Sequence, residues 1–307
     1  MPQQTKIRIP RNIIDLSAHI YTPDNFDAEA AYPALIVVHP GGGVKEQTAG
    51  LYAQKLANFG FITVAYDASY QGESGGVPHF LESPSDRVED ISWVLDYLER
   101  HDNVDSSRIG LMGICAGGGY ALNAVQIDRR VKAVATVSGI DIGWLFRDAF
   151  GQDPFPTVIA TLDQVAEGRR AEAKGADFLT ASYVPNSPEE FTDATPEYAK
   201  EAYEYYNTPR AHYPTAANTI LLRSFPRVLS YDAFEFVDKL LTQPLLMIIG
   251  SQADTAYQSE SVIKRAASKD KELFTIDGAT HVSLYDKGEH VNPAVDKLAA
   301  FFSEKLN

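Results

Sequence analysis

Short apolar runs rich in Val and Ile alternate along this chain with longer segments in which apolar residues recur at helical spacing. This alternation is typical of a parallel sheet buried between two layers of helices. We therefore predict an α/β fold with a mostly parallel central sheet and helices on both faces. The runs that predict parallel strands are 34–39, 61–66, 108–113, 131–138, 244–250 and 273–276, and helices are predicted over 50–58, 85–99, 119–127, 259–267 and 294–306. Alternating residues over 6–21 predict an antiparallel pair at the sheet edge.

A long segment, 142–240, interrupts this pattern between the fourth and fifth predicted parallel strands. Most connections in compact α/β domains are a few residues and one helix, so we predict an insertion here, mainly helical. Residues 1–141 and 241–307 would form the core, and 142–240 a cap over the carboxyl edge of the sheet, where ligands of such sheets bind. The alternative is a second helical layer that closes the sheet. Aromatic residues of the insertion that could line a substrate pocket are Trp144, Phe146, Tyr203, Tyr205, Tyr206, Tyr213, Phe225 and Tyr231.

The single cysteine, Cys115, lies in GICAGGG between a predicted strand and a predicted helix. A nucleophile on a strained strand-to-helix turn needs small neighbours, and Gly113 and Gly117 flank it at that spacing. The helix starting at Ala116 directs its N-terminus at the sulfur, which favours a thiolate. The pattern predicts that Cys115 is a nucleophile. The alternatives are a buried structural cysteine and an engineered replacement for serine.

A nucleophile needs a base and a partner that orients the base. His281 and Asp254 each follow one of the last two predicted strands, and the order nucleophile, acid, histidine is that of α/β-hydrolases. We predict His281 as the base and Asp254 as the acid, with Asp141 as the alternative acid.

Acyl transfer also needs donors for a developing oxyanion. The sequence HPGGG follows the first central strand, and Pro40 has no N–H to give. The predicted donors are therefore Gly41 or Gly42, together with Ala116.

Composition narrows the choice of partners. The net charge of -14 would repel nucleic acid and anionic membrane surfaces. One cysteine allows no intramolecular disulfide, no run approaches the roughly 18 apolar residues of a membrane span, and the N-terminus lacks the apolar region of a signal peptide. We expect a cytoplasmic protein. No group of His, Cys and carboxylate residues has metal-ligand spacing, so we expect no metal and no cofactor.

The segments GICAGG, HPGGG, DASYQGESGG, GSQADT and GATHVSLYD together resemble α/β-hydrolases of the dienelactone hydrolase and YcjY-like type. The resemblance covers about residues 31–141 and 240–307. It implies the α/β-hydrolase fold and a Cys-His-Asp triad, in which Cys115 attacks an ester, lactone or thioester, His281 moves the proton and Asp254 holds the imidazole. The partners expected are a small-molecule acyl substrate and a second copy of the chain in a homodimer. Acyl transfer and ligand binding without turnover are the competing functions.

Overall fold

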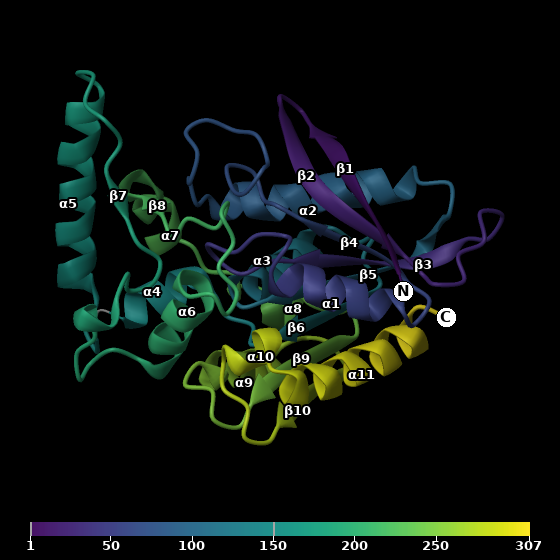
Figure 1. Ribbon diagram of the computed structural model, residues 1–307. Coiled ribbons are helices and arrows are strands. Elements are labelled where there is room, and N and C mark those ends of the chain that lie inside the picture. Colours follow the sequence, from purple (N-terminus) through teal and green to yellow (C-terminus); the bar gives the residue numbers. More distant parts are fainter. Residues whose placement is uncertain (1, 150) are drawn as a thin grey trace.

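In the computed structural model, which describes residues 2–149 and 151–307, an eight-stranded sheet forms the centre of the molecule (Figure 1). The strand order is β1-β2-β4-β3-β5-β6-β9-β10. The first two strands pair antiparallel at one edge, β2 pairs antiparallel with β4, and the remaining neighbours are parallel. The strands are β1 (Gln3–Arg11), β2 (Ile14–Thr22), β3 (Tyr32–Val38), β4 (Ile62–Tyr66), β5 (Val104–Ile114), β6 (Ala133–Val137), β9 (Leu245–Gly250) and β10 (Lys271–Ile276). The six predicted parallel strands and the predicted edge pair are confirmed.

Both faces of the sheet are buried, which explains why its central strands are continuous apolar runs rather than alternating ones. In β3, Leu35 and Val37 pack into one core cluster while Ile36 and Val38 pack into the other. Helices α2, α3, α8 (Val237–Leu240) and α9 contribute to the second cluster, and α1 and α11 cover the opposite face (Figure 1). The helices outside the insertion are α1 (Thr48–Ala57), α2 (Pro84–Glu99), α3 (Ala116–Ile127), α9 (Ala256–Arg265), α10 (Ser283–Asp286) and α11 (Gly288–Lys305).

The long segment between β6 and β9 is mainly helical. Figure 1 shows α5 standing farthest from the sheet, while α8 joins the core through the fully buried Val237. The final part of the segment therefore belongs to a helical layer on the sheet, and its earlier part lies beyond the sheet. Its elements are α4 (Ile142–Asp148), α5 (Phe155–Glu172), β7 (Thr180–Ala181), η1 (Pro188–Glu190), α6 (Glu197–Asn207), β8 (Ile220–Leu221), η2 (Leu222–Ser224), α7 (Phe225–Leu229) and α8 (Val237–Leu240).

The register of the parallel strands brings their carboxyl ends together. Val38 of β3 pairs with Gly113 of β5, and Ile114 pairs with Val137 of β6. The loops that follow β3, β5, β9 and β10 consequently start along one edge of the sheet, where side chains far apart in sequence can meet.

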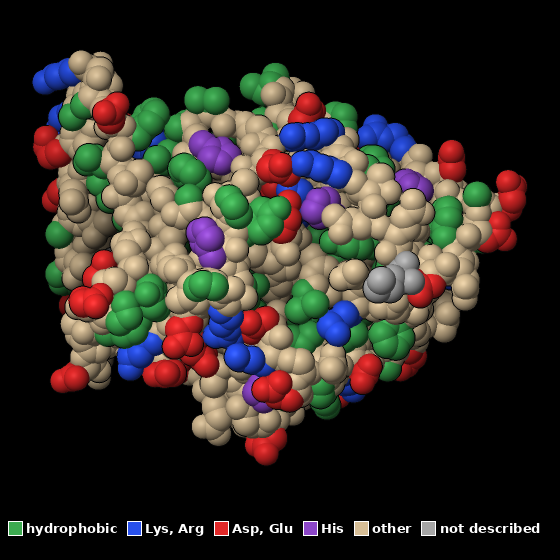
Figure 2. Space-filling view, in the orientation of Figure 1, with side chains coloured by type: hydrophobic (Ala, Val, Ile, Leu, Met, Phe, Trp, Pro, Cys, Tyr) green, Lys and Arg blue, Asp and Glu red, His purple; other side chains and the backbone are tan. Residues whose placement is uncertain are grey.

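On the face drawn in Figure 2, the acidic side chains do not form a single cluster. Asp and Glu side chains are spread across this face and interleaved with Lys and Arg. Among the described residues, no helix has both the length and the apolar character that crossing a membrane requires.

Candidate active site

The turn between β5 and α3 holds Cys115 in a strained backbone conformation. Its φ of 55° and ψ of −126° lie in a region that residues with a side chain rarely adopt. The turn is fixed on both sides, since the Cys115 N–H donates to the carbonyl of Val137 at 3.0 Å and the Ile140 N–H donates to the carbonyl of Cys115 at 3.0 Å. The backbone thus presents the thiol at the carboxyl edge of the sheet.

The glycines beside the cysteine are required by close backbone contacts. A Cβ on Gly113 would collide with the carbonyl oxygen of Gly117. A Cβ on Gly117 would collide with the end of β3, where it would lie 2.6 Å from the carbonyl oxygen of His39. The turn can pack this tightly against its neighbours only because both positions lack a side chain.

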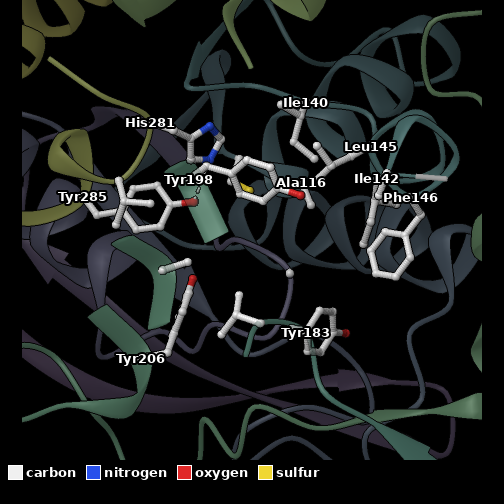
Figure 3. Close-up of a pocket in the computed structure, with 16 residues that line it drawn as sticks. Ala116, Ile140, Ile142, Leu145, Phe146, Tyr183, Tyr198, Tyr206, His281 and Tyr285 are labelled. Atoms are coloured by element: carbon white, nitrogen blue, oxygen red, sulfur yellow. Dashed lines mark hydrogen bonds between the residues drawn. The ribbon is translucent and has the colours of Figure 1, made fainter. Parts of the chain in front are cut away.

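A cavity of about 170 Å³ opens on Cys115 (Figure 3). The loops at the strand ends supply its base, and residues of the insertion on α4, on α6 and after β7 supply much of the rest. Most of the lining is apolar or aromatic. The lining residues are Gly41, Cys115, Ala116, Ile140, Ile142, Leu145, Phe146, Ala149, Tyr183, Val184, Tyr198, Ala202, Tyr206, His281, Val282 and Tyr285.

His281 lies in this cavity with both ring nitrogens engaged. Its Nδ1 is 2.5 Å from the Oγ1 of Thr255, and its Nε2 is 3.0 Å from the hydroxyl of Tyr285. The residue is only 2% exposed, and burial lowers the pKa of the imidazole to about 4. At neutral pH the ring is therefore uncharged and can accept a proton.

The thiol of Cys115 faces three hydrogen-bond donors: the hydroxyl of Tyr285 and the backbone N–H groups of Ala116 and Gly41. Burial nevertheless raises the pKa of the thiol, and these donors only oppose that shift. The sequence predicted that the helix N-terminus favours a thiolate, but removal of the sulfur from water has the larger effect. Cys115 and His281 consequently form a neutral pair at pH 7.

The carboxylates predicted to hold the histidine lie elsewhere. Asp254 is exposed, and its Oδ2 accepts the N–H of Tyr198 at 3.1 Å. Among the described residues, the hydrogen bonds of the His281 ring go to Thr255 and Tyr285, so the predicted contact between Asp254 and His281 is not formed. The neighbouring Thr255 is buried and fills that place, because the chain at the start of α9 turns its side chain inward and leaves Asp254 outside.

The alternative acid, Asp141, is also occupied. It caps α4 through the Trp144 N–H, and its other oxygen accepts the N–H of Ala233 at 2.7 Å. Burial raises the pKa of Asp141 to about 6. These contacts tie the beginning of α4 to the segment before α8, which is a structural role.

Of the two glycines predicted as oxyanion donors after β3, Gly41 lies at the thiol with Ala116. Gly42 adopts a φ of 70°, and a Cβ there would collide with the ring of Tyr183. Gly42 thus supports the turn and the packing of Tyr183, while the N–H of Gly41 is one of the donors that lower the pKa of the Cys115 thiol.

Two of the aromatic residues predicted from the insertion, Phe146 and Tyr206, line the cavity (Figure 3). The sequence-based prediction missed Tyr183 and Tyr198, although Tyr198 lies on α6 at four-residue spacing from Ala202 and then Tyr206, which line the cavity with it. It also missed Tyr285, which lies in the short helix α10 four residues after His281, a spacing that brings two side chains close together along a helical turn.

Comparison with known proteins identifies the family. The sequence pattern of the family described as "Serine aminopeptidase, S33" matches residues 31–288. The chain belongs to this family. Its fold and family make this S33 member an α/β-hydrolase. The protein YcjY of Escherichia coli (strain K12) is 48% identical to this hydrolase over 295 residues, which are 95% of each chain.

A crystal structure and a fungal relative extend the comparison. The structure of the hypothetical protein PA2218 from Pseudomonas aeruginosa is 32% identical, with a TM-score of 0.89 over 99% of this hydrolase and 94% of that chain. A protein named thiohydrolase from Eupenicillium brefeldianum is 25% identical over 226 residues, 73% of this chain and 70% of its own.

Proposed function

We propose that this S33 α/β-hydrolase cleaves a carboxylic ester or thioester, lactones included, through an acyl group carried on Cys115. The observation that carries the proposal is the surrounding of the sulfur: a thiol on a strained turn, open to a cavity, with the N–H groups of Gly41 and Ala116 directed at it. A carbonyl attacked by this sulfur would develop its negative charge beside those two donors. Donors placed in advance at such a position stabilise a tetrahedral intermediate strongly.

The neutral resting pair sets the order of events. As the sulfur of Cys115 attacks the carbonyl carbon, the thiol proton passes to His281, and the tetrahedral oxyanion is held by Gly41 and Ala116. The imidazolium then returns the proton to the leaving alcohol or thiol, and an acyl-cysteine remains. A water molecule that gives its proton to His281 attacks the acyl group, and the collapse of the second intermediate releases the carboxylic acid and restores the thiol.

In this proposal the residue that orients the base is Thr255 rather than Asp254. With the ring hydrogen on Nδ1, the hydroxyl of Thr255 accepts that N–H, as the acid of a charged triad does, and the lone pair of Nε2, which faces the hydroxyl of Tyr285, is the one that takes the proton. The threonine supplies no negative charge, however, and the low pKa of His281 reflects burial alone. We therefore propose a cysteine–histidine pair with a threonine support.

The cavity indicates the size and character of the acyl group. Its volume of about 170 Å³ is close to that of cavities of about 150 Å³ that admit benzene, and its walls are mostly apolar and aromatic. A benzoyl or short branched acyl group fits this space, whereas a long unbranched chain exceeds it. The similarity to a protein named thiohydrolase favours a thioester among the substrates.

Intact-protein mass spectrometry after mixing with p-nitrophenyl acetate tests the mechanism. We expect an acyl adduct on the wild-type chain, release of p-nitrophenol, and neither in Cys115→Ala. In His281→Gln the adduct should form far more slowly. Absence of both adduct and release in the wild type would overturn the acyl-cysteine mechanism and leave ligand binding as the function.

Two further comparisons sharpen the test. Esters and thioesters of acetate, butyrate, benzoate and palmitate should be turned over best at intermediate acyl size. Cys115→Ser should be less active than the wild type, because a site with two neutral partners activates a thiol more easily than a hydroxyl. Product carrying the acyl group on an added alcohol or amine, in place of free acid, would assign acyl transfer instead of hydrolysis.

A further inference from the structure

One phenol lies between the two reacting side chains of the proposed site. The hydroxyl of Tyr285 is 3.0 Å from the Nε2 of His281, it lines the same cavity as Cys115, and as a hydrogen-bond donor it lowers the pKa of the Cys115 thiol. Figure 3 shows Tyr285 beside His281, with the phenol hydroxyl directed toward the imidazole. The phenol is thus the shared partner of the nucleophile and the base.

Packing holds this phenol in one position. Tyr285 is 2% exposed, and the ring of Tyr205 packs edge-on against it with 5.2 Å between ring centres. The hydroxyl of Tyr52 donates to the carbonyl of Leu284, the preceding residue, at 2.8 Å. Freedom to swing out of the line between sulfur and nitrogen is therefore small.

One tautomer of His281 suits proton transfer from Cys115. With its hydrogen on Nδ1, the ring donates to the Oγ1 of Thr255, and the lone pair of Nε2 accepts from the hydroxyl of Tyr285. We infer that Tyr285 relays the proton from Cys115 to His281. This inference rests on the function proposed above, and it makes Tyr285 a catalytic residue that touches a reacting atom.

The step balances without any other reactant. Before transfer the Tyr285 hydroxyl donates to Nε2 and its oxygen accepts from the thiol. The thiol proton moves to the oxygen of Tyr285 as the hydroxyl proton moves to Nε2, which leaves an imidazolium and a thiolate that now accepts from the Tyr285 hydroxyl. Burial raises the pKa of Tyr285 well above its ordinary value, so a free phenolate is not an intermediate and the two transfers occur together. In the reverse movement, the imidazolium proton passes to the oxygen of Tyr285 as the hydroxyl proton passes to the leaving alcohol or thiol.

Tyr285→Phe removes only the relaying hydroxyl and keeps the ring that fills the space. We expect acylation by p-nitrophenyl acetate, followed in a single turnover, to slow by at least about 100-fold, the lower end of what a positioned acid–base group contributes. In mixtures of light and heavy water, the wild-type rate should depend on deuterium fraction with the curvature of two protons in motion, and the variant should lose that curvature. Tyr205→Phe is the matched control, because it removes a buried phenol that contacts Tyr285 but lies outside the cavity lining.

A second measurement does not depend on acyl chemistry. The rate of alkylation of Cys115 by iodoacetamide, followed against pH, reports the thiolate directly. Loss of the Tyr285 donor should move this profile to higher pH, while Tyr205→Phe should not move it. Melting temperatures of both variants identify any general loss of structure.

The outcomes separate the relay from the proposed function. Wild-type acylation rate, curvature and alkylation profile in Tyr285→Phe would overturn the relay while the acyl-cysteine mechanism stood. Failure of the wild type to form any acyl adduct would overturn the proposed function. In that case, a shifted alkylation profile would still support the Tyr285 contact with the thiol, and an unshifted one would refute it.

Discussion

The residue that supports His281 can be tested by changing Thr255 and Asp254 separately. Thr255→Val keeps the shape of the side chain and removes the oxygen that lies 2.5 Å from Nδ1. The buried N–H of the ring would then have no partner. Asp254→Asn removes the charge of an exposed carboxylate that accepts the backbone N–H of Tyr198 and does not contact the imidazole of His281.

The expected magnitudes follow from burial. Leaving a buried donor without a partner costs about 1–3 kcal/mol, which corresponds to a loss of roughly 5- to 150-fold in kcat/KM if the cost falls on the active geometry. Thr255→Ser keeps the hydroxyl and should stay within about 3-fold of the wild type. Asp254→Asn should also stay within about 3-fold, because exposed polar contacts contribute little.

The assay is kcat/KM for p-nitrophenyl acetate across the three variants, with melting temperatures to confirm that each is folded. In enzymes with a charged triad, changing the acid to its amide lowers kcat by about 10⁴-fold. A loss of that size in Asp254→Asn, together with a mild effect of Thr255→Val, would refute the role given to Thr255. It would show instead that Asp254 reaches His281 during catalysis, as the sequence predicts.

Three further expectations concern stability. Gly117→Ala should lower the free energy of unfolding by about 3 kcal/mol or more, because its Cβ would meet the backbone at the end of β3. Gly288→Ala on α11 should change it by less than about 1 kcal/mol, because its Cβ would make only an ordinary contact with Asn292; equal denaturant midpoints for the two variants would contradict this. As the pH falls from 6.5 toward 4, unfolded chains bind a proton on His281 that folded chains refuse, so this residue should contribute a loss of stability of about 3 kcal/mol, with a loss of the same sign from the buried His39. His281→Gln should remove its own share of this acid limb, which melting at each pH would reveal. Lys45→Met should lower the free energy of unfolding by about 3–5 kcal/mol, because the buried carboxylate of Asp67 would lose its cation. Adding Asp67→Asn should recover part of that loss in urea titrations; no recovery in the double variant would contradict the role of the ion pair.

The order of strands and helices was predictable because it depends on local repetition. Residues 34–38 are apolar at every position because both faces of β3 are buried, so the strand can be recognised from consecutive residues alone. The elbow was predictable for a related reason. Gly113 and Gly117 are needed within a few residues of Cys115, so the constraint and the residue that it serves lie together in the chain.

The sequence by itself therefore determined the sheet, the covering helices, the strained turn at Cys115 and the placement of His281 at the same edge. It did not determine which neighbour reaches the imidazole, because Asp254 and Thr255 differ by one position, and only the start of α9 decides which side chain points inward. Nor did the sequence determine the charge state of Cys115 and His281. The helix N-terminus beside Cys115 can be recognised locally, but the burial that raises the pKa of the thiol depends on residues of the insertion that line the cavity. The approach of Tyr285 to Cys115 likewise exists only after β5 and β10, which are distant in the chain, have placed their carboxyl ends at one edge of the sheet.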